Sequence, residues 1–167
     1  LEQLVRHDPL TGLLNRRGFE PKASLLFDLA MRGGRPLSVC MIDADHFKKI
    51  NDAHGHAVGD QVLKSIADRL QGRMRRTDVL ARWGGEEFVL LLPDSGIDAA
   101  RQVADELRRA VAAATDATWG HVTVSVGLAQ STPTDASLDE LLERADRALY
   151  RAKDRGRNQV STFDALS

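Results

Sequence analysis

Apolar residues recur along the chain with two different periods, and each period predicts one kind of element. A period of about 3.6 residues predicts helices at 17–31, 56–74, 97–111 and 138–152. Continuous or alternating apolar runs predict strands at 37–42, 79–81, 88–92, 122–128 and 158–163. A short turn of helix is also expected at 46–52. Ser95 is a candidate cap for the third long helix, and Ser137 with Glu140 has capping-box spacing before the fourth.

The segment Arg82-Trp83-Gly84-Gly85-Glu86-Glu87-Phe88 lies between two apolar runs, and this arrangement predicts a β-hairpin. Gly84 and Gly85 permit positive φ at the tip and leave room for a ligand to approach the backbone closely. Glu86 and Glu87 follow at once. Because neighbouring side chains of a strand point to opposite faces, we expect these two carboxylates to have different roles.

The order of the elements predicts a mixed central sheet flanked by helices, of the ferredoxin-like kind, with a βααββαβ core. In such a fold the end of the first strand, with Asp43 and Asp45, meets the hairpin tip. Asp43 and Glu86 are therefore expected to converge although they lie far apart in the sequence.

Composition narrows the class of protein. With 167 residues, 43% hydrophobic and 28% charged, the chain is expected to be one globular domain. The net charge of −1 gives no general reason to expect nucleic-acid binding, although Arg73, Arg75 and Arg76 cluster. The single cysteine, Cys40, lies in an apolar run, which favours a buried core thiol in a reducing cytoplasm over a nucleophile.

The chain begins at Leu1 without a methionine or a signal-like segment, which suggests a piece of a longer protein. We expect residues 1–8 to be the end of an upstream linker helix and residues 9–167 to form the catalytic domain. A sensory or regulatory domain is expected upstream. The location is expected to be cytoplasmic, with any membrane anchor in regions outside this sequence.

Several polar residues have the chemistry of a site for a metal ion and a nucleotide. Carboxylates at Asp43 and Glu86, with a backbone carbonyl, suit Mg²⁺ bound together with substrate phosphates. The helical turn after residue 45 can present N–H groups to phosphate, and Lys48 adds positive charge. Asn51 and Asp60 can read the edge of a base, and a carboxylate that faces N–H donors favours guanine.

Each of these residues also fits a plainer role. Asp43 and Asp45 are also typical of ordinary acids at a strand end, and the hairpin tip is also typical of a solvated turn. His54 and His56 lack a second His/Cys pair, so packing or capping is favoured over zinc binding. Taken together, the acids and glycines favour a site.

Five blocks of the sequence match, in order, the motifs of the GGDEF-type diguanylate cyclase domain, which the chain resembles over almost its whole length. They lie at 8–17, 43–60, 82–88, 125–127 and 145–158. The signature is Gly84-Gly85-Glu86-Glu87-Phe88, with Glu86 where many members have Asp. The resemblance implies a nucleotidyl-cyclase-like fold.

The resemblance also implies an activity, the condensation of two GTP molecules into cyclic di-GMP with release of two pyrophosphates. Each subunit of an antiparallel homodimer would hold one GTP. Two divalent ions per GTP, Mg²⁺ or alternatively Mn²⁺, would be bound by Asp43, the main chain of Ala44 and Glu86. Glu87 is implied as a further metal ligand or a base. Paired metals can activate the attacking 3′-hydroxyl and neutralise the leaving group.

The resemblance assigns the remaining contacts by position. Phosphate contacts are implied for Phe47 and Lys48, guanine contacts for Asn51 and Asp60, close backbone approach for Gly84 and Gly85, and terminal-phosphate contacts for Lys153 and Arg157. Arg75 and Asp78 match the family's RxxD inhibitory site, which binds dimers of the product. An Arg and an Asp at this spacing also occur by chance. Arg101, Arg108 and Arg109 are equal candidates for the arginine that completes such a site from another copy.

Two other functions fit parts of the sequence. A catalytically silent domain could bind GTP or cyclic di-GMP and signal by contact, and a plain dimerisation module would explain the apolar stripes alone. The intact Asp43, Glu86, Glu87 and Lys48 favour an active enzyme over both.

Overall fold

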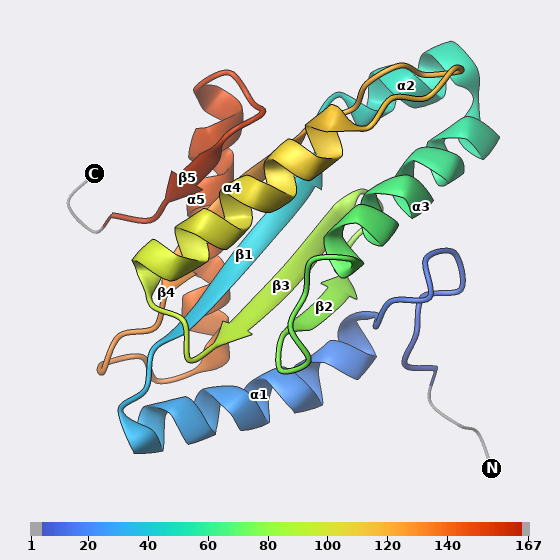
Figure 1. Cartoon of the computed structure of the whole chain (residues 1–167). Coiled ribbons are helices and arrows are strands. Elements are labelled where there is room, and N and C mark those ends of the chain that lie inside the picture. Colours follow the sequence, from blue (N-terminus) through green and yellow to red (C-terminus); the bar gives the residue numbers. More distant parts are fainter. Residues whose placement is uncertain (1–4, 165–167) are drawn as a thin grey trace.

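The structure is a computed structural model that describes residues 5–164 (Figure 1). Within them the helices are α1 (Arg16–Gly33), α2 (Phe47–His54), α3 (His56–Gln71), α4 (Ile97–Ala113) and α5 (Leu138–Asp154). The strands are β1 (Leu37–Ala44), β2 (Val79–Arg82), β3 (Glu87–Pro93), β4 (Val124–Gln130) and β5 (Val160–Thr162). All the strands expected from the sequence are present, as are the four long helices and the short helix after residue 45.

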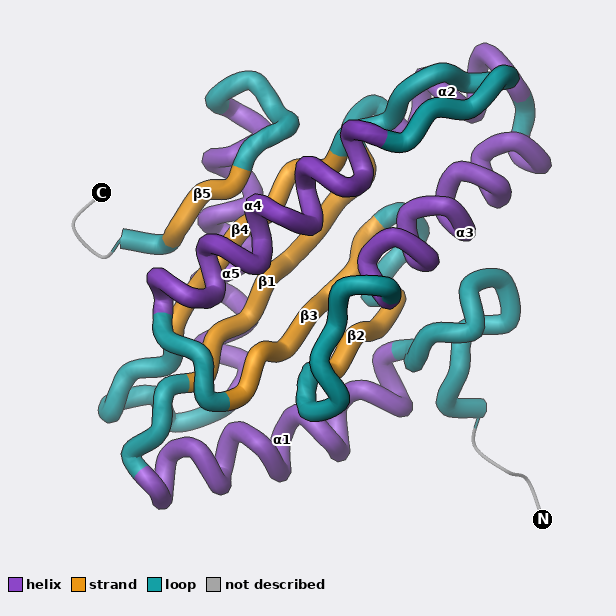
Figure 2. Tube along the Cα trace, in the orientation of Figure 1, coloured by secondary structure: helices purple, strands orange, loops and turns teal. Residues whose placement is uncertain are grey.

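The strands form one mixed sheet in the order β2-β3-β1-β4-β5 (Figure 2). Neighbouring strands run antiparallel except β4 and β5, which are parallel. The short final strand expected at 158–163 is therefore an edge strand. Helices cover both faces of the sheet, which confirms the predicted α/β class and the mixed sheet flanked by helices.

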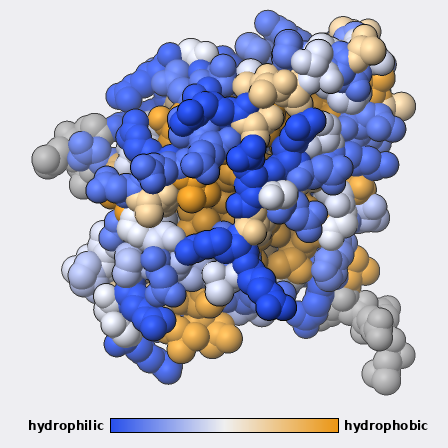
Figure 3. Space-filling model, in the orientation of Figure 1, coloured by the Kyte–Doolittle hydropathy of each residue, from blue (hydrophilic) through white to orange (hydrophobic). Residues whose placement is uncertain are grey.

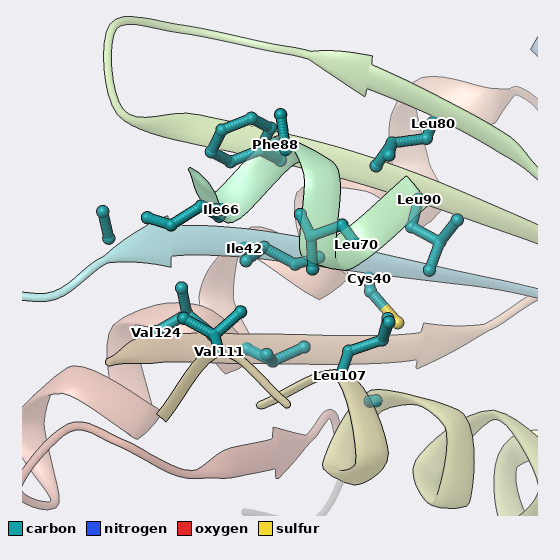
Figure 4. Close-up of a cluster of buried hydrophobic side chains, with 14 of the residues drawn as sticks. Cys40, Ile42, Ile66, Leu70, Leu80, Phe88, Leu90, Leu107, Val111 and Val124 are labelled. Atoms are coloured by element: carbon teal, nitrogen blue, oxygen red, sulfur yellow. The ribbon is translucent and has the colours of Figure 1, made fainter. Parts of the chain in front are cut away.

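Strand β1 lies at the centre of the sheet and is buried along its whole length. Cys40 and Ile42 face a core that includes Ile66 of α3 and Leu107 of α4 (Figure 4). Val39 and the other alternate residues of β1 face a second core built with α1 and α5. Burial on two faces explains why this strand is a continuous apolar run.

The Cys40 side chain is fully buried, and the absence of water around it raises the pKa of the thiol to about 12. A thiol of that kind stays protonated at neutral pH and is a poor nucleophile. The prediction of a buried core thiol is confirmed.

The predicted cap at Ser95 is wrong, and Ser137 is the N-cap of α5 in position only. Helix α4 is capped by Gly96, and the Ile97 N–H donates to Oε1 of Gln130 at 2.8 Å, so a side chain from β4 replaces the expected Ser95. Ser137 does precede α5, but its side chain makes no capping bond. Glu140 accepts instead from the N–H of Ala136, one residue before the expected position.

The boundaries differ from the predicted ones at several points. Strand β1 continues to Ala44, so Asp43 lies inside it rather than after it. The short turn expected at 46–52 is an eight-residue helix, and α3 ends at Gln71, three residues early. Residues 5–8 are not helical in the structure, and the rest of the expected linker helix lies outside the described residues.

Helix α5 packs directly against the backbone of β4 because Gly127 has no side chain. A Cβ at this position would lie 2.1 Å from the carbonyl oxygen of Ala145 and 2.1 Å from the amide nitrogen of Leu149. The contact fixes how close the helix lies to the sheet. It therefore also fixes where the last turn of α5, which carries Lys153, stands relative to β1.

The face of the molecule in Figure 3 is largely hydrophilic, with hydrophobic atoms at the surface over α1. Helix α1 carries two of the exposed leucines, Leu25 and Leu29, while Phe19 and Phe27 of the same helix are buried. Among the described residues no helix has both the length and the apolar character needed to cross a membrane.

Candidate active site

The carboxylates singled out in the sequence meet across two neighbouring strands. Asp43 of β1 is the register partner of Glu87 at the start of β3. Directly opposed residues of an antiparallel pair place their side chains on the same face of the sheet. Glu86 precedes them in the turn, and its carbonyl oxygen accepts from the N–H of Ala44 at 3.1 Å. The expected convergence of the first strand's acid with the hairpin tip is present, and Glu87 lies even more directly opposite Asp43 than Glu86 does.

The three acids repel one another in a partly dry environment. Burial raises the pKa of Asp43, whose side chain is only 5% exposed, although Lys153 acts to lower it. Burial also raises the pKa values of Glu86 and Glu87, and the negative charge of Asp43 raises both further. Nearby like charges and desolvation each disfavour the ionised form. The cluster therefore gains from the approach of a cation.

Lys153 supplies one cation from the last turn of α5. Its Nζ donates to Oδ2 of Asp43, a residue 110 positions earlier in the chain. Its charge also lowers the pKa values of Glu86 and Glu87. The family resemblance implies that this lysine contacts terminal phosphates. Its contact with the acids was not predicted, because no local pattern reports a pairing over such a separation.

Asp45 has the structural role that the sequence left open. Its carboxylate accepts from the hydroxyl of Thr123 at 2.7 Å, the hydroxyl of Ser125 at 2.6 Å and the N–H of Asn158 at 3.0 Å. Three hydrogen bonds within the chain leave this side chain little capacity for a metal ion. It ties the end of β1 to β4 and to the segment before β5.

The donor set fits a hard divalent ion that is shared with a substrate. Within residues 5–164, no three Asp, Glu, His or Cys side chains are placed to hold a metal ion on their own. Carboxylate oxygens at Asp43, Glu86 and Glu87 are nevertheless ligands that Mg²⁺ or Mn²⁺ prefers, and Mg²⁺ is commonly bound by one or two carboxylates plus substrate phosphates. The site would then be completed by phosphate oxygens.

Helix α2 begins next to these acids. His46 precedes it with a φ of 56°, and the first N–H groups of a helix have no partner within that helix. The side chain of Phe47 is buried in the core, so only its backbone can face a phosphate. Lys48 is exposed. The structure therefore narrows the expected Phe47 contact to its main chain.

The side chain of Asn51 on α2 packs against Gly59 of α3. The Oδ1 atom of Asn51 is buried, and it has no hydrogen-bond partner among the described residues. A Cβ on Gly59 would lie 1.9 Å from that oxygen, so the glycine makes room for it. A buried acceptor without a partner costs stability unless a ligand supplies the donor. Asp60 follows Gly59 and is exposed.

Arg82 fixes the shape of the hairpin tip. Its guanidinium donates to the carbonyl oxygens of Gly84 at 3.2 Å and Gly85 at 2.7 Å, and it forms an ion pair with Asp8 at 3.1 Å. Asp8 accepts in turn from the backbone and hydroxyl of Thr11, and these bonds help to lower its pKa. The N-terminal turn and the tip are therefore linked, which the sequence analysis did not predict.

Arg16 braces the same tip from helix α1. Its Nε donates to the carbonyl oxygen of Trp83 at 3.0 Å, and its guanidinium carbon lies 4.1 Å from the centre of the Trp83 ring. Arginine over an aromatic face is a favourable cation–π arrangement. The arginines within the block at 8–17 were the signal that could have pointed to this contact.

Arg75 and Asp78 come together as the RxxD spacing suggested, but they bind each other. The guanidinium of Arg75 donates to Asp78 at 2.9 Å, to the carbonyl oxygen of Pro93 at 2.9 Å and to the hydroxyl of Ser95 at 3.0 Å. The side chain of Asp78 is 3% exposed. In this arrangement Asp78 is closed to a ligand, whereas the side chain of Arg75 is 52% exposed.

The other arginines singled out in the sequence lie after α5 and on α4. Arg157 follows α5 and is exposed, and its charge lowers the pKa of Asp43. On α4, Arg108 and Arg109 both pair with Asp105, while Arg101 donates to the hydroxyl of Thr162. The geometry of a single chain does not favour any of the α4 arginines as the one that completes an inhibitory site.

Comparison with known proteins agrees with this geometry. The chain is 44% identical to the diguanylate cyclase DgcM of Escherichia coli over 96% of its length, and 40% identical to the response regulator PleD of Caulobacter vibrioides over 95%. It spans only 39% and 36% of those relatives. Among solved structures, the GGDEF domain of DgcB from Caulobacter crescentus in complex with c-di-GMP superposes with a TM-score of 0.92 at 33% identity, covering 99% of this chain and 97% of that one.

A second solved structure, the active GGEEF domain of a diguanylate cyclase from Vibrio cholerae, has a TM-score of 0.87 at 33% identity and covers 91% of this chain and 98% of that one. The family model described as "Diguanylate cyclase, GGDEF domain" matches residues 5–159, nearly the whole chain. The chain therefore belongs to the GGDEF domain family of diguanylate cyclases.

Proposed function

We propose that this domain is catalytically competent and condenses two GTP molecules into cyclic di-GMP, with release of two pyrophosphates. The observation that carries the proposal is the opposition of Asp43 and Glu87 across β1 and β3, with Glu86 beside them and Lys153 reaching in from α5. A silent copy of the domain has no need to keep three mutually repelling acids at one end of its sheet.

Two divalent ions per GTP, Mg²⁺ or alternatively Mn²⁺, would be held by Asp43, Glu86 and the main chain of Ala44, with Glu87 as a further ligand or base. When bound, such ions lower the pKa of the attacking 3′-hydroxyl and neutralise charge on the leaving pyrophosphate. The chain's own part is to hold the triphosphate with the start of α2, Lys48, Lys153 and Arg157, which orients the α-phosphorus for in-line attack.

Guanine recognition is proposed for Asn51 of α2 and Asp60 of α3, with the Asn51 side chain turning outward from Gly59 to meet the base. The unpartnered Oδ1 of Asn51 can accept from an N–H of the base, and the carboxylate of Asp60 can accept from a second. Guanine presents neighbouring ring and exocyclic N–H donors, so this pair of acceptors favours it over adenine.

One chain supplies one half of the reaction, because the 3′-hydroxyl that attacks belongs to a second bound GTP. We therefore propose that catalysis needs an antiparallel homodimer, with Gly84 and Gly85 leaving room at the tip for the substrate. Product inhibition is proposed at Arg75 and Asp78. Since these two residues bind each other in the structure, the product would have to separate them in order to reach Asp78. An upstream domain would set the geometry of the dimer.

Incubation of the protein with GTP and Mg²⁺, followed by chromatographic detection of cyclic di-GMP, tests the proposal. The rate per chain should rise with protein concentration, since two half-sites must meet. The wild-type chain and Glu86→Ala should be compared at the same high concentration. Nucleotide that binds wild type but is recovered unchanged with Mg²⁺ and Mn²⁺, in protein shown to be dimeric, would favour the silent signalling module instead.

A further inference from the structure

Lys153 is bonded to one of the two carboxylate oxygens of Asp43, a residue proposed to bind the metal ion. Its Nζ is bonded to Oδ2 of Asp43, and the Asp43 side chain is 5% exposed, so a second cation has little room to approach while the pair is closed. An ion pair and a metal bond at the same carboxylate oxygen compete directly. For the described residues, the lack of any three ligand side chains ready to hold an ion agrees with this picture.

The lysine is also free to leave. Its side chain is 34% exposed and stands in the last turn of α5, on a flexible four-carbon stem. Lysine carries a compact charge that can follow a stronger anion, and a triphosphate offers more negative charge and more acceptor oxygens than a single carboxylate. A nucleotide bound along α2 would present such an anion beside the acid cluster.

We propose that Lys153 acts as a resident cation on Asp43 that opposes metal binding until a nucleotide draws it away. This inference rests on the proposed function, because it assumes that the acids bind metal and that GTP is the nucleotide. Its consequence is that metal and nucleotide bind cooperatively. Coupling between two ligands is reciprocal, so the metal ion strengthens nucleotide binding by the same factor by which the nucleotide strengthens metal binding.

The test is the affinity for Mn²⁺ measured by electron paramagnetic resonance, without turnover. Each protein is titrated alone and with a GTP analogue in which methylene replaces the α,β-bridging oxygen, so that no pyrophosphate can leave. The variant is Lys153→Met, which keeps the length of the side chain and removes its charge. The matched control is Arg157→Met, since Arg157 also acts electrostatically on Asp43 but, in the part of the chain that is described, no hydrogen bond joins its guanidinium to Asp43.

The expected result is that Lys153→Met binds Mn²⁺ without nucleotide about tenfold more tightly than wild type, within the usual range of coupling between sites. The enhancement by the analogue should shrink by a similar factor. Arg157→Met should change nucleotide-free binding by less than about threefold, as an exposed charge usually does. Circular dichroism and thermal melting of all three proteins show whether the fold is kept.

Equal strengthening in both variants would overturn the inference, because it would show a general effect of charge rather than competition at Asp43. Unchanged nucleotide-free affinity in folded Lys153→Met would overturn it too. Wild-type protein that binds no Mn²⁺ even with the analogue would contradict the proposed function itself, and that outcome differs from both of the others.

Discussion

Charged side chains lie at both ends of strand β3, but the balance of charge differs between the two ends. At the amino end, Glu87 and the adjacent Glu86 lie against Asp43, and burial with mutual repulsion raises the pKa of each. At the carboxyl end, the carbonyl oxygen of Pro93 accepts from Arg75, which is also bonded to Asp78 and Ser95. The first end has too little positive charge, whereas at the second the buried carboxylate of Asp78 is paired with an arginine.

The two ends therefore differ in the free-energy cost of binding a charged ligand. An under-compensated cluster gains free energy when a cation or a cation-bearing substrate arrives, so binding relieves a cost already present in the folded chain. At the other end, a ligand that takes the place of Asp78 on Arg75 must first break the hydrogen bonds between them, so binding there has to exceed an internal cost. Catalysis suits the first end and concentration-dependent inhibition suits the second.

The largest expected effect is on turnover at the amino end. Glu86→Ala removes a carboxylate proposed to bind metal, and cyclic di-GMP production should fall by about a thousandfold or more, since metal stabilisation of the transition state is worth several kcal/mol. Chromatography of the nucleotide products measures this. Glu106→Ala, which removes an exposed acid on α4, is the control and should keep the wild-type rate. Wild-type turnover in Glu86→Ala would discredit the proposed metal site.

The next effect concerns inhibition at the carboxyl end. Arg75→Ala removes the planar fork proposed to hold the product, so the concentration of added cyclic di-GMP that halves the rate should rise about tenfold or more. Initial rates at increasing cyclic di-GMP measure it. If the variant is inhibited as strongly as wild type, the assignment of Arg75 and Asp78 as the inhibitory site is wrong.

The same substitution should weaken the fold. Arg75→Ala leaves the buried carboxylate of Asp78 without its guanidinium partner, which should lower the free energy of unfolding by about 1–3 kcal/mol. Urea denaturation gives the value. Adding Asp78→Asn should recover part of the loss if the unpaired charge is the cause. Additive losses in the double variant would contradict a direct pair.

A smaller loss of activity should follow from loosening the hairpin tip. Asp8→Asn weakens the ion pair with Arg82, whose guanidinium fixes the carbonyl groups of Gly84 and Gly85, so turnover should fall by about three- to tenfold through poorer positioning. Asp28→Asn, on an exposed position of α1, is the matched control. Equal rates in the two variants would show that the tip holds its shape without the N-terminal turn.

The smallest effect is a gain in stability at the amino end. The folded pKa of Glu87 is raised above its ordinary 4.5, so the folded chain binds more protons than the unfolded chain, and stability is lost as pH rises through that folded pKa. Glu87→Gln removes this loss and should raise the melting temperature by about 1–2 °C at pH 7, a small value because water screens a half-exposed charge. The gain should vanish below pH 4.5. Melting curves at both pH values check it.

The sequence was sufficient for the parts of this molecule that depend on local pattern. The buried run of β1, the stripes of the long helices and the double glycine of the hairpin each report their own environment, and all of them lie where their patterns indicated. The meeting of Asp43 with the hairpin tip followed from topology, because antiparallel neighbours in a sheet bring distant residues into register.

What the sequence could not provide depends on contacts between distant elements. Three contacts require the packed positions of two or three elements at once. They are the pairing of Lys153 with Asp43, the hydrogen bonds of Asp45 to hydroxyls of the β4 segment, and the bonds of Arg75 to Pro93 and Ser95. The wrong prediction of a cap at Ser95 has the same origin, because the side chain of Gln130 in β4 accepts the hydrogen bond from the N–H of Ile97 at the start of α4. The local preferences of residues do not show which of several side chains will make a given hydrogen bond in the folded chain.

Gly127 sets the position of a side chain in the candidate site, although it lies in the interior of the domain. Because its missing Cβ would lie 2.1 Å from two backbone atoms of α5, where ordinary contacts are 3.4–4 Å, even one added methyl group would push the helix away from the sheet and carry Lys153 with it. The position of the Lys153 ammonium relative to the Asp43 carboxylate is thus set from the interior of the domain. Variation among relatives at this buried position, or at the residues stacked on it, could retune substrate affinity while every residue of the reaction centre stayed the same.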